Sequence, residues 1–284
     1  MKKAALVTVH GMGTTPCNYA DELTKELRRR LGTLFDDLHI GTVYYQSILQ
    51  ENEERVWDKV AERLKWDELR KFLLFGFADA AGLESGKEQF DSVYAQAQVK
   101  VARELYRASV ASKPNAPLII IAQSLGCQVI SCYFWDALRA QRGEAVANGI
   151  WSDISLYESQ ISGDAALGPE QISFLQGSSF QHLLTTGCNI PIFVAAHATN
   201  KILPIIPNQI FKWDNYYDRD DVLGWPLADL SDEYARVVTD HPVNAGSGVF
   251  GWLLKSWNPL SHGQYWGDNE VLDPLEAKLR QVLG

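Results

Sequence analysis

Short apolar runs bounded by turn residues alternate along this chain with longer amphipathic segments. The runs have the length of strands, and their enrichment in Ile, Leu and Val is typical of strands buried on both faces of a sheet. The strongest of them is 117–121, Pro-Leu-Ile-Ile-Ile. The predicted strands are 6–9, 40–45, 117–121, 191–196, 211–217 and the less regular 236–239.

Helical periodicity fills the intervals between these strands. The helix before the central strand carries one apolar stripe, formed by Phe90, Tyr94, Ala97, Val101 and Leu105. Segments 20–31 and 129–138 are also helical in pattern, and the last helix is predicted to begin at Asp273-Pro274, an N-cap followed by proline. Strands that alternate with helices predict an α/β fold, with a mostly parallel sheet of about six strands covered on both faces.

Two stretches interrupt the alternation. Residues 51–89 are helical but lie between strands that need only one helix, and residues 143–189 are polar and rich in loops. Neither has a convincing core of its own, so we expect a single domain over 1–284 with both stretches as lid or cap insertions over the carboxyl edge of the sheet. The apolar run 72–77 could line a pocket from such a lid, or pack on the edge of the sheet.

The candidate nucleophile follows the central strand directly. Ser124 lies between a buried strand and a helix, with the small residues Ala122 and Gly126 two positions to either side. A serine in such a tight turn adopts a strained backbone and holds its hydroxyl above the sheet, at the N-terminus of the following helix. The usual pattern is G-x-S-x-G, and this chain has alanine at the first glycine position. The alternative is an ordinary serine that caps a helix.

A second motif, His10-Gly11-Met12-Gly13, follows the first predicted strand. Acyl transfer needs two N–H donors for the developing oxyanion, one from the residue after the nucleophile and one from a loop after an adjacent strand. Leu125 and Met12 are the candidate donors, and His10 and Gly11 are expected to shape the loop. The alternative is a simple glycine turn between a strand and a helix.

A serine nucleophile also needs a general base, for which the chain offers six histidines. We expect His262 to be the base, because it lies in the loop before the final helix. The last connection of the fold would place a side chain of this loop over Ser124. His241, after the last predicted strand, is the second choice. His197 follows a predicted strand end and could also approach the site.

The base in turn needs an orienting carboxylate. The loop after the fifth predicted strand carries three, Asp218, Asp220 and Asp221. Asp220 is the first choice, and the other two stay open, because a slip of one residue is not settled by the sequence. At most one of them orients the base; aspartates in such loops more commonly form turns.

These residues resemble the α/β-hydrolase superfamily, within its lipase- and esterase-like members. The order Ser124, Asp220, His262 is that superfamily's order, and the resemblance covers almost the whole chain. It implies the compact α/β-hydrolase fold and a serine hydrolase that cleaves a carboxylic ester of a small molecule through an acyl-enzyme, without metal or organic cofactor. An amidase, a thioesterase or an acyltransferase with the same triad, or a non-catalytic binding module, are the alternatives, because this fold hosts many functions.

Composition narrows the choice of partners and location. The net charge is −9, and the only basic cluster, 28–30, lies on a helical pattern with acidic neighbours, so we expect no nucleic-acid binding. No apolar run approaches the roughly 20 residues of a membrane helix, so we expect no integral membrane association. The four cysteines form no CxxC pair, which argues against a zinc site or a disulfide framework and favours a cytoplasmic protein.

Overall fold

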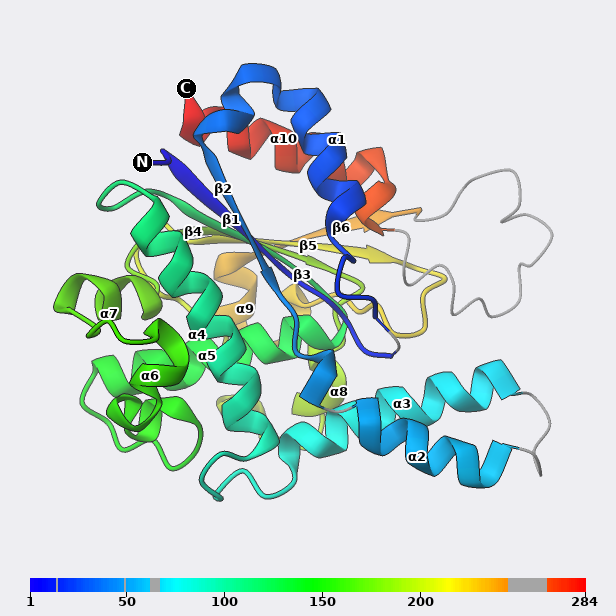
Figure 1. Ribbon diagram of the computed structural model, residues 1–284. Coiled ribbons are helices and arrows are strands. Elements are labelled where there is room, and N and C mark those ends of the chain that lie inside the picture. Colours follow the sequence, from blue (N-terminus) through cyan, green and yellow to red (C-terminus); the bar gives the residue numbers. More distant parts are fainter. Residues whose placement is uncertain (14, 49, 62–66, 245–264) are drawn as a thin grey trace.

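The computed structural model describes residues 1–13, 15–48, 50–61, 67–244 and 265–284. It confirms the α/β class, with a six-stranded, all-parallel sheet in the order β2-β1-β3-β4-β5-β6 (Figure 1). The strands are β1 (Ala4–Val9), β2 (Leu38–Val43), β3 (Leu118–Gln123), β4 (Phe180–Thr186), β5 (Lys212–Asp218) and β6 (Val238–Val243).

Helices cover both faces of the sheet (Figure 1). One face packs against α1 (Asp21–Leu31) and α10 (Asn269–Leu283), and the other against α4 (Val93–Ala111), α5 (Leu125–Gln141), α8 (Ile190–Val194) and α9 (Asp232–Val237). In β3, Leu118 and Ile120 belong to the core of the second face, whereas Ile119 and Ile121 belong to that of the first. Both faces of this strand therefore need apolar side chains, which explains its unbroken apolar run.

The stretch 143–189 is not the insertion that the sequence led us to expect. It ends in β4, which lies between β3 and β5 in the sheet, and its earlier part includes α6 (Glu158–Ser162) and α7 (Pro169–Leu175), both packed against α4. The strand was missed because polar residues interrupt it. Thr185 and Thr186 are nevertheless fully buried, because their hydroxyls donate to Asn215 Oδ1 at 2.8 Å and to the Ala122 carbonyl at 3.3 Å.

The predicted strand 191–196 is wrong for a related reason. These residues overlap α8, in which Pro191 lies in the first turn, where the missing N–H of proline leaves no hydrogen bond unmade. The apolar run is short, and its length alone does not separate a strand from one buried turn of helix. The prediction of about six strands holds only because β4 takes the place of this segment.

The last helix starts earlier than predicted, at Asn269 rather than after Asp273. Its N-cap is Asp268, whose carboxylate accepts a hydrogen bond from the Glu270 N–H at 2.8 Å. Pro274 consequently lies inside the helix instead of at its first position.

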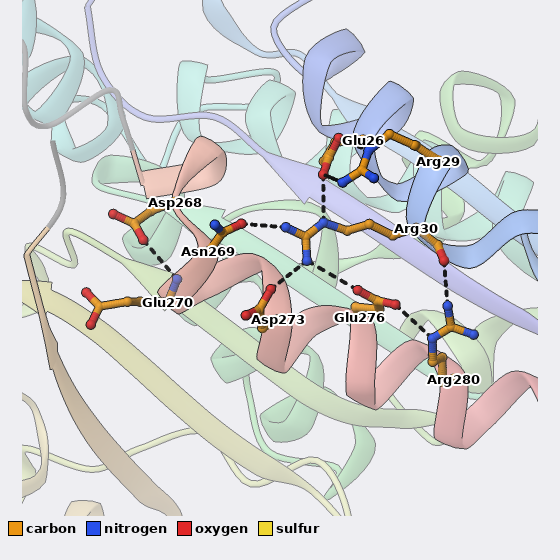
Figure 2. Close-up of polar contacts among 9 residues, drawn as sticks. All are labelled: Glu26, Arg29, Arg30, Asp268, Asn269, Glu270, Asp273, Glu276 and Arg280. Carbon is orange, nitrogen blue, oxygen red and sulfur yellow. Dashed lines mark hydrogen bonds and ion pairs between the residues drawn. The ribbon is translucent and has the colours of Figure 1, made fainter. Parts of the chain in front are cut away.

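Arg30, in the basic cluster of α1, connects the first helix to the last (Figure 2). Its guanidinium pairs with Asp273 at 2.5 Å, Glu276 at 3.2 Å and Glu26 at 2.7 Å, and donates to Asn269 Oδ1 at 2.5 Å. The Arg30 side chain is only 12% exposed, so these contacts fix the position of α10 on the sheet.

The other insertion, 51–89, contains the helices α2 (Gln50–Val60) and α3 (Asp67–Glu84). A short 3-10 turn, η2 (Gln46–Ile48), joins the pair to the end of β2, and Figure 1 shows it beyond the carboxyl ends of β1 and β2. The apolar run 72–77 belongs to α3, where Phe77 is 68% exposed. None of the described helices is both long and apolar enough to cross a membrane.

Candidate active site at the strand switch point

The strand order reverses between β1 and β3. The chain runs from β1 outward to β2 and then returns to the other side of β1 to form β3. In open α/β sheets, ligands bind in the crevice outside the carboxyl ends of the strands at such a switch point. The two loops that leave these ends carry Gly11, Met12 and Ser124, so the fold brings together the two motifs that lie more than 100 residues apart in the sequence.

Ser124 is the single residue between the end of β3 and the start of α5. Its backbone has φ 50° and ψ −123°, in the left-handed half of the map that a serine rarely adopts. The Ser124 N–H donates to the Thr186 carbonyl at 2.9 Å, and its own carbonyl accepts from the Cys127 N–H at 2.9 Å, which fixes the turn from both sides. The hydroxyl caps no N–H of α5, which argues against an ordinary helix cap.

Two glycines allow the close packing that this turn requires. A Cβ at Gly126 would lie 2.3 Å from the His10 carbonyl oxygen and 2.9 Å from that of Val9, so α5 begins in direct contact with the end of β1. A Cβ at Gly11 would lie 2.9 Å from Ser124 Cβ and 3.5 Å from Ser124 Oγ. The loop after β1 therefore lies against the serine itself.

The Ser124 hydroxyl is fully buried, and within the described chain Oγ has no hydrogen-bond partner. Leaving such a group unpaired costs about 1–3 kcal/mol, and Ser112 is a second buried serine of this kind among the described residues, so the hydroxyl supports a functional role only together with the strained backbone of Ser124. The N–H groups of Met12 and Leu125 take part in no hydrogen bond within the described residues either. One buried hydroxyl and two N–H groups, all without partners among the described residues, thus lie at the start of α5 and in the loop that packs against it.

The His10 side chain stabilises the loop after β1. Nδ1 lies 2.7 Å from the Gly11 carbonyl, Nε2 accepts from the Tyr45 N–H at 3.1 Å, and the ring stacks on that of Tyr45 at 4.0 Å. Burial lowers the pKa of His10 to about 4, against a smaller opposite effect of the Gly11 carbonyl, so the ring is neutral at pH 7. Both ring nitrogens are thus occupied, and His10 shapes the loop.

The three candidate acids differ in their surroundings. Asp220 is exposed, whereas Asp218 at the end of β5 and Asp221 are 5% and 7% exposed. Asp218 Oδ1 accepts the Asp220 N–H at 2.8 Å, and Asp221 accepts the Leu223 N–H at 2.9 Å and the Tyr265 hydroxyl at 2.8 Å. A triad acid is buried and held by hydrogen bonds. This argues against Asp220, the first choice from sequence, and favours the other two.

The His241 side chain contacts residues other than Ser124. Its Nε2 lies 2.8 Å from Asp214 Oδ1, and its ring stacks on Tyr216 at 4.8 Å. The strand register puts His241 level with Gln123 but three strands away, about 14 Å at the usual strand spacing. This separation removes His241 as a base for Ser124.

Two other described histidines, His39 and His182, are also remote from Ser124. His39 on β2 pairs in register with Ala5, and His182 on β4 pairs with Ile119, so both lie toward the amino edge of the sheet. Burial lowers the pKa of both rings. His197 follows α8 and is exposed.

His262, the base expected from the sequence, lies outside the described residues. The described part of the chain resumes at Tyr265 and Trp266, which contact residues at the carboxyl edge of the sheet. Trp266 Nε1 donates to Thr186 Oγ1 at 3.2 Å, on the residue whose carbonyl holds Ser124. The Tyr265 hydroxyl accepts the Asp218 N–H at 3.0 Å.

Thr186 and Tyr265, which link these parts, were not identified from the sequence. Thr186 lies in the missed strand, whose three apolar residues, Phe180, Leu183 and Leu184, were the available signal. Tyr265 follows His262 closely in the expected base loop, but nothing in the sequence distinguishes its hydroxyl.

Among the described residues, no group of three or more His, Cys, Asp or Glu side chains could hold a metal ion. No family model matches the chain, and no curated protein matches it.

Proposed function

We propose that the protein is a serine hydrolase that cleaves carboxylic esters, with Ser124 as its nucleophile. The observation that carries the proposal is the left-handed backbone of Ser124 between β3 and α5, against which Gly11 packs. Strained residues at ligand-binding edges are a feature of functional sites, and this one presents a hydroxyl at the N-terminus of a 17-residue helix. The strand order and the compact sheet support an α/β-hydrolase fold, with α2 and α3 as the proposed lid.

In the proposed reaction, His262 takes the proton of Ser124 Oγ while Oγ attacks the ester carbonyl. The N–H groups of Met12 and Leu125 stabilise the oxyanion, and the alcohol leaves with the proton held by His262. Water then attacks the acyl-enzyme with His262 again as the base, which releases the acid and restores Ser124. Because Ser124 is fully buried, the elements over this edge must open for turnover.

The proposed orienting acid is Asp218 or Asp221. Both are buried, and each accepts a backbone N–H, which fixes a carboxylate in one direction. Tyr265 is bonded to both residues and lies three positions after His262 in the chain. Three extended residues span about 10 Å, which leaves residue 262 within chain reach of these carboxylates.

A short p-nitrophenyl ester tests the proposal on the whole protein. Ser124→Ala is expected to lower kcat/KM by more than about 1000-fold. The control is Ser112→Ala, which removes another buried hydroxyl that has no partner among the described residues, at the amino edge of the sheet. Asp218→Asn and Asp221→Asn identify the acid, and Asp220→Asn is expected to be near wild type. Equal turnover by Ser124→Ala and the wild type would reject the proposal.

A further inference from the structure

Two buried carboxyl groups meet beside the loop that carries the candidate oxyanion donor. Glu53 of α2 is 5% exposed, and Asp79 of α3 is fully buried. Each carboxyl group affects the pKa of the other, and neither oxygen of Glu53 accepts a hydrogen bond from an N–H or O–H donor of the described residues. Neither residue is needed for the triad, so this pair requires its own explanation.

Asp79 connects the pair to the oxyanion loop. Its Oδ2 accepts a hydrogen bond from the Gly13 N–H at 3.0 Å. One turn earlier on the same helix, a Cβ at Gly76 would lie 2.4 Å from Met12 Sδ, so the helix backbone is in contact with the Met12 side chain. Helix α3 thus holds the loop at two consecutive residues, one of which is the candidate oxyanion donor.

Two carboxyl groups in contact away from water do not both ionise, so the pair holds one proton. Burial, reinforced by Asp79, raises the pKa of Glu53 to about 9, and burial raises that of Asp79 as well. The Gly13 N–H and the Gln46 amide oppose the rise at Asp79. The proton therefore resides on Glu53, which donates to the Asp79 carboxylate.

The surroundings reinforce this assignment. Glu54 on α2 adds negative charge that raises the pKa of Glu53 further. Tyr45, just beyond β2, is fully buried, and burial together with the charge of Asp79 raises the pKa of its phenol well above its usual value. The pair is thus faced by Gln46, Glu54, Tyr45 and the Gly13 N–H.

We infer that Asp79 is a positioning residue for the oxyanion loop and that it holds the loop only while Glu53 shares its proton. The inference rests on the proposed function, because it concerns the same site. When the pH rises and Glu53 ionises, two carboxylates repel one another at the contact between α2 and α3. Helix α3 then no longer positions Gly13 and Met12, and catalysis declines while Ser124 and the buried candidate acids stay in place.

The test is the pH profile of ester hydrolysis, with Ser124→Ala as the blank at every pH. For the wild type, kcat is expected to fall above about pH 9, where Glu53 loses its proton, with KM nearly constant. Glu53→Gln supplies a permanent N–H donor to Asp79 and is expected to lose this alkaline decline. Asp79→Ala removes the acceptor and is expected to lower kcat ten- to hundredfold at pH 7.5, because a misplaced loop costs about 100-fold.

Two further variants complete the set. Asp79→Asn keeps an acceptor for Gly13 and a donor for Glu53, so its alkaline decline should also disappear, which covers a failure of Asp79→Ala to fold. The matched control is Asp58→Asn, which removes an exposed carboxylate from the same helix as Glu53 and should retain the wild-type profile.

Three results would overturn the inference while leaving the proposed function intact. One is a wild-type alkaline decline in Glu53→Gln and Asp79→Asn, and another is an unchanged kcat in folded Asp79→Ala. The third is loss of activity on chelation with recovery on adding Ca²⁺, which would make the pair a cation site. Full activity of Ser124→Ala would instead reject the proposed function itself.

Discussion

Replacing Ser124 with glycine is expected to abolish ester hydrolysis and, at the same time, to make the protein more stable than Ser124→Ala. A non-glycine residue at φ 50° and ψ −123° stores about 1–3 kcal/mol of strain, which glycine does not. The greater freedom of glycine in the unfolded chain offsets about 0.5–1 kcal/mol of that gain. We therefore expect the free energy of unfolding to be about 1 kcal/mol higher for Ser124→Gly than for Ser124→Ala.

Urea denaturation of matched pairs checks this expectation. Ser112 is also a buried serine whose hydroxyl has no partner in the described part of the chain, but its φ is −103°. At Ser112 the order should reverse, with the glycine variant less stable than the alanine variant. If Ser124→Gly proves less stable than Ser124→Ala, the turn is not strained, and the main observation behind the proposed nucleophile is lost.

Gly126→Ala is expected to destabilise the protein strongly. The added methyl group would lie 2.3 Å from the carbonyl oxygen of His10 and 2.9 Å from that of Val9, the last residue of β1, and neither backbone atom can turn aside. We expect the free energy of unfolding to fall by at least about 3 kcal/mol, because relief requires α5 to move away from the sheet. Any folded fraction should be inactive, because Ser124 moves with α5.

Gly267→Ala is the matched control for that substitution. A Cβ at Gly267 has no atom of the described residues within 4 Å, so the variant should unfold within about 1 kcal/mol of the wild type. Equal unfolding midpoints for Gly126→Ala and Gly267→Ala would show that helix α5 does not press on β1 as the structure describes. The close approach of the two motifs would then have to be abandoned.

The central features of the fold could be predicted because local and global requirements agree there. β3 is apolar on both faces, and the turn after it needs small residues on either side of Ser124, so pattern and packing lead to the same element. β4 was missed because its stability depends on hydrogen bonds of Thr185 and Thr186 to partners distant in the sequence. No local pattern shows whether such polar residues will be satisfied.

The candidate site could be predicted only in part. The proposed nucleophile and the proposed oxyanion loop have short local motifs, whereas the choice of a candidate acid depends on burial, which separates Asp218 and Asp221 from Asp220 only in three dimensions. The Glu53–Asp79 pair could not be predicted from the sequence, for another reason. Asp79 interrupts an apolar stretch of α3, which is a visible signal, but Glu53 lies in an acidic run that is typical of a solvated surface.

The central claim is that Ser124 is a nucleophile, and covalent labelling tests it most directly. The wild-type protein is treated with a fluorophosphonate, which phosphonylates activated serines, and the modified peptide is identified by mass spectrometry. We predict one added phosphonyl group per chain, on Ser124, with no labelling of Ser124→Ala and normal labelling of Ser112→Ala. Modification of a different residue, or ester hydrolysis by a protein that is never labelled at Ser124, would contradict the claim.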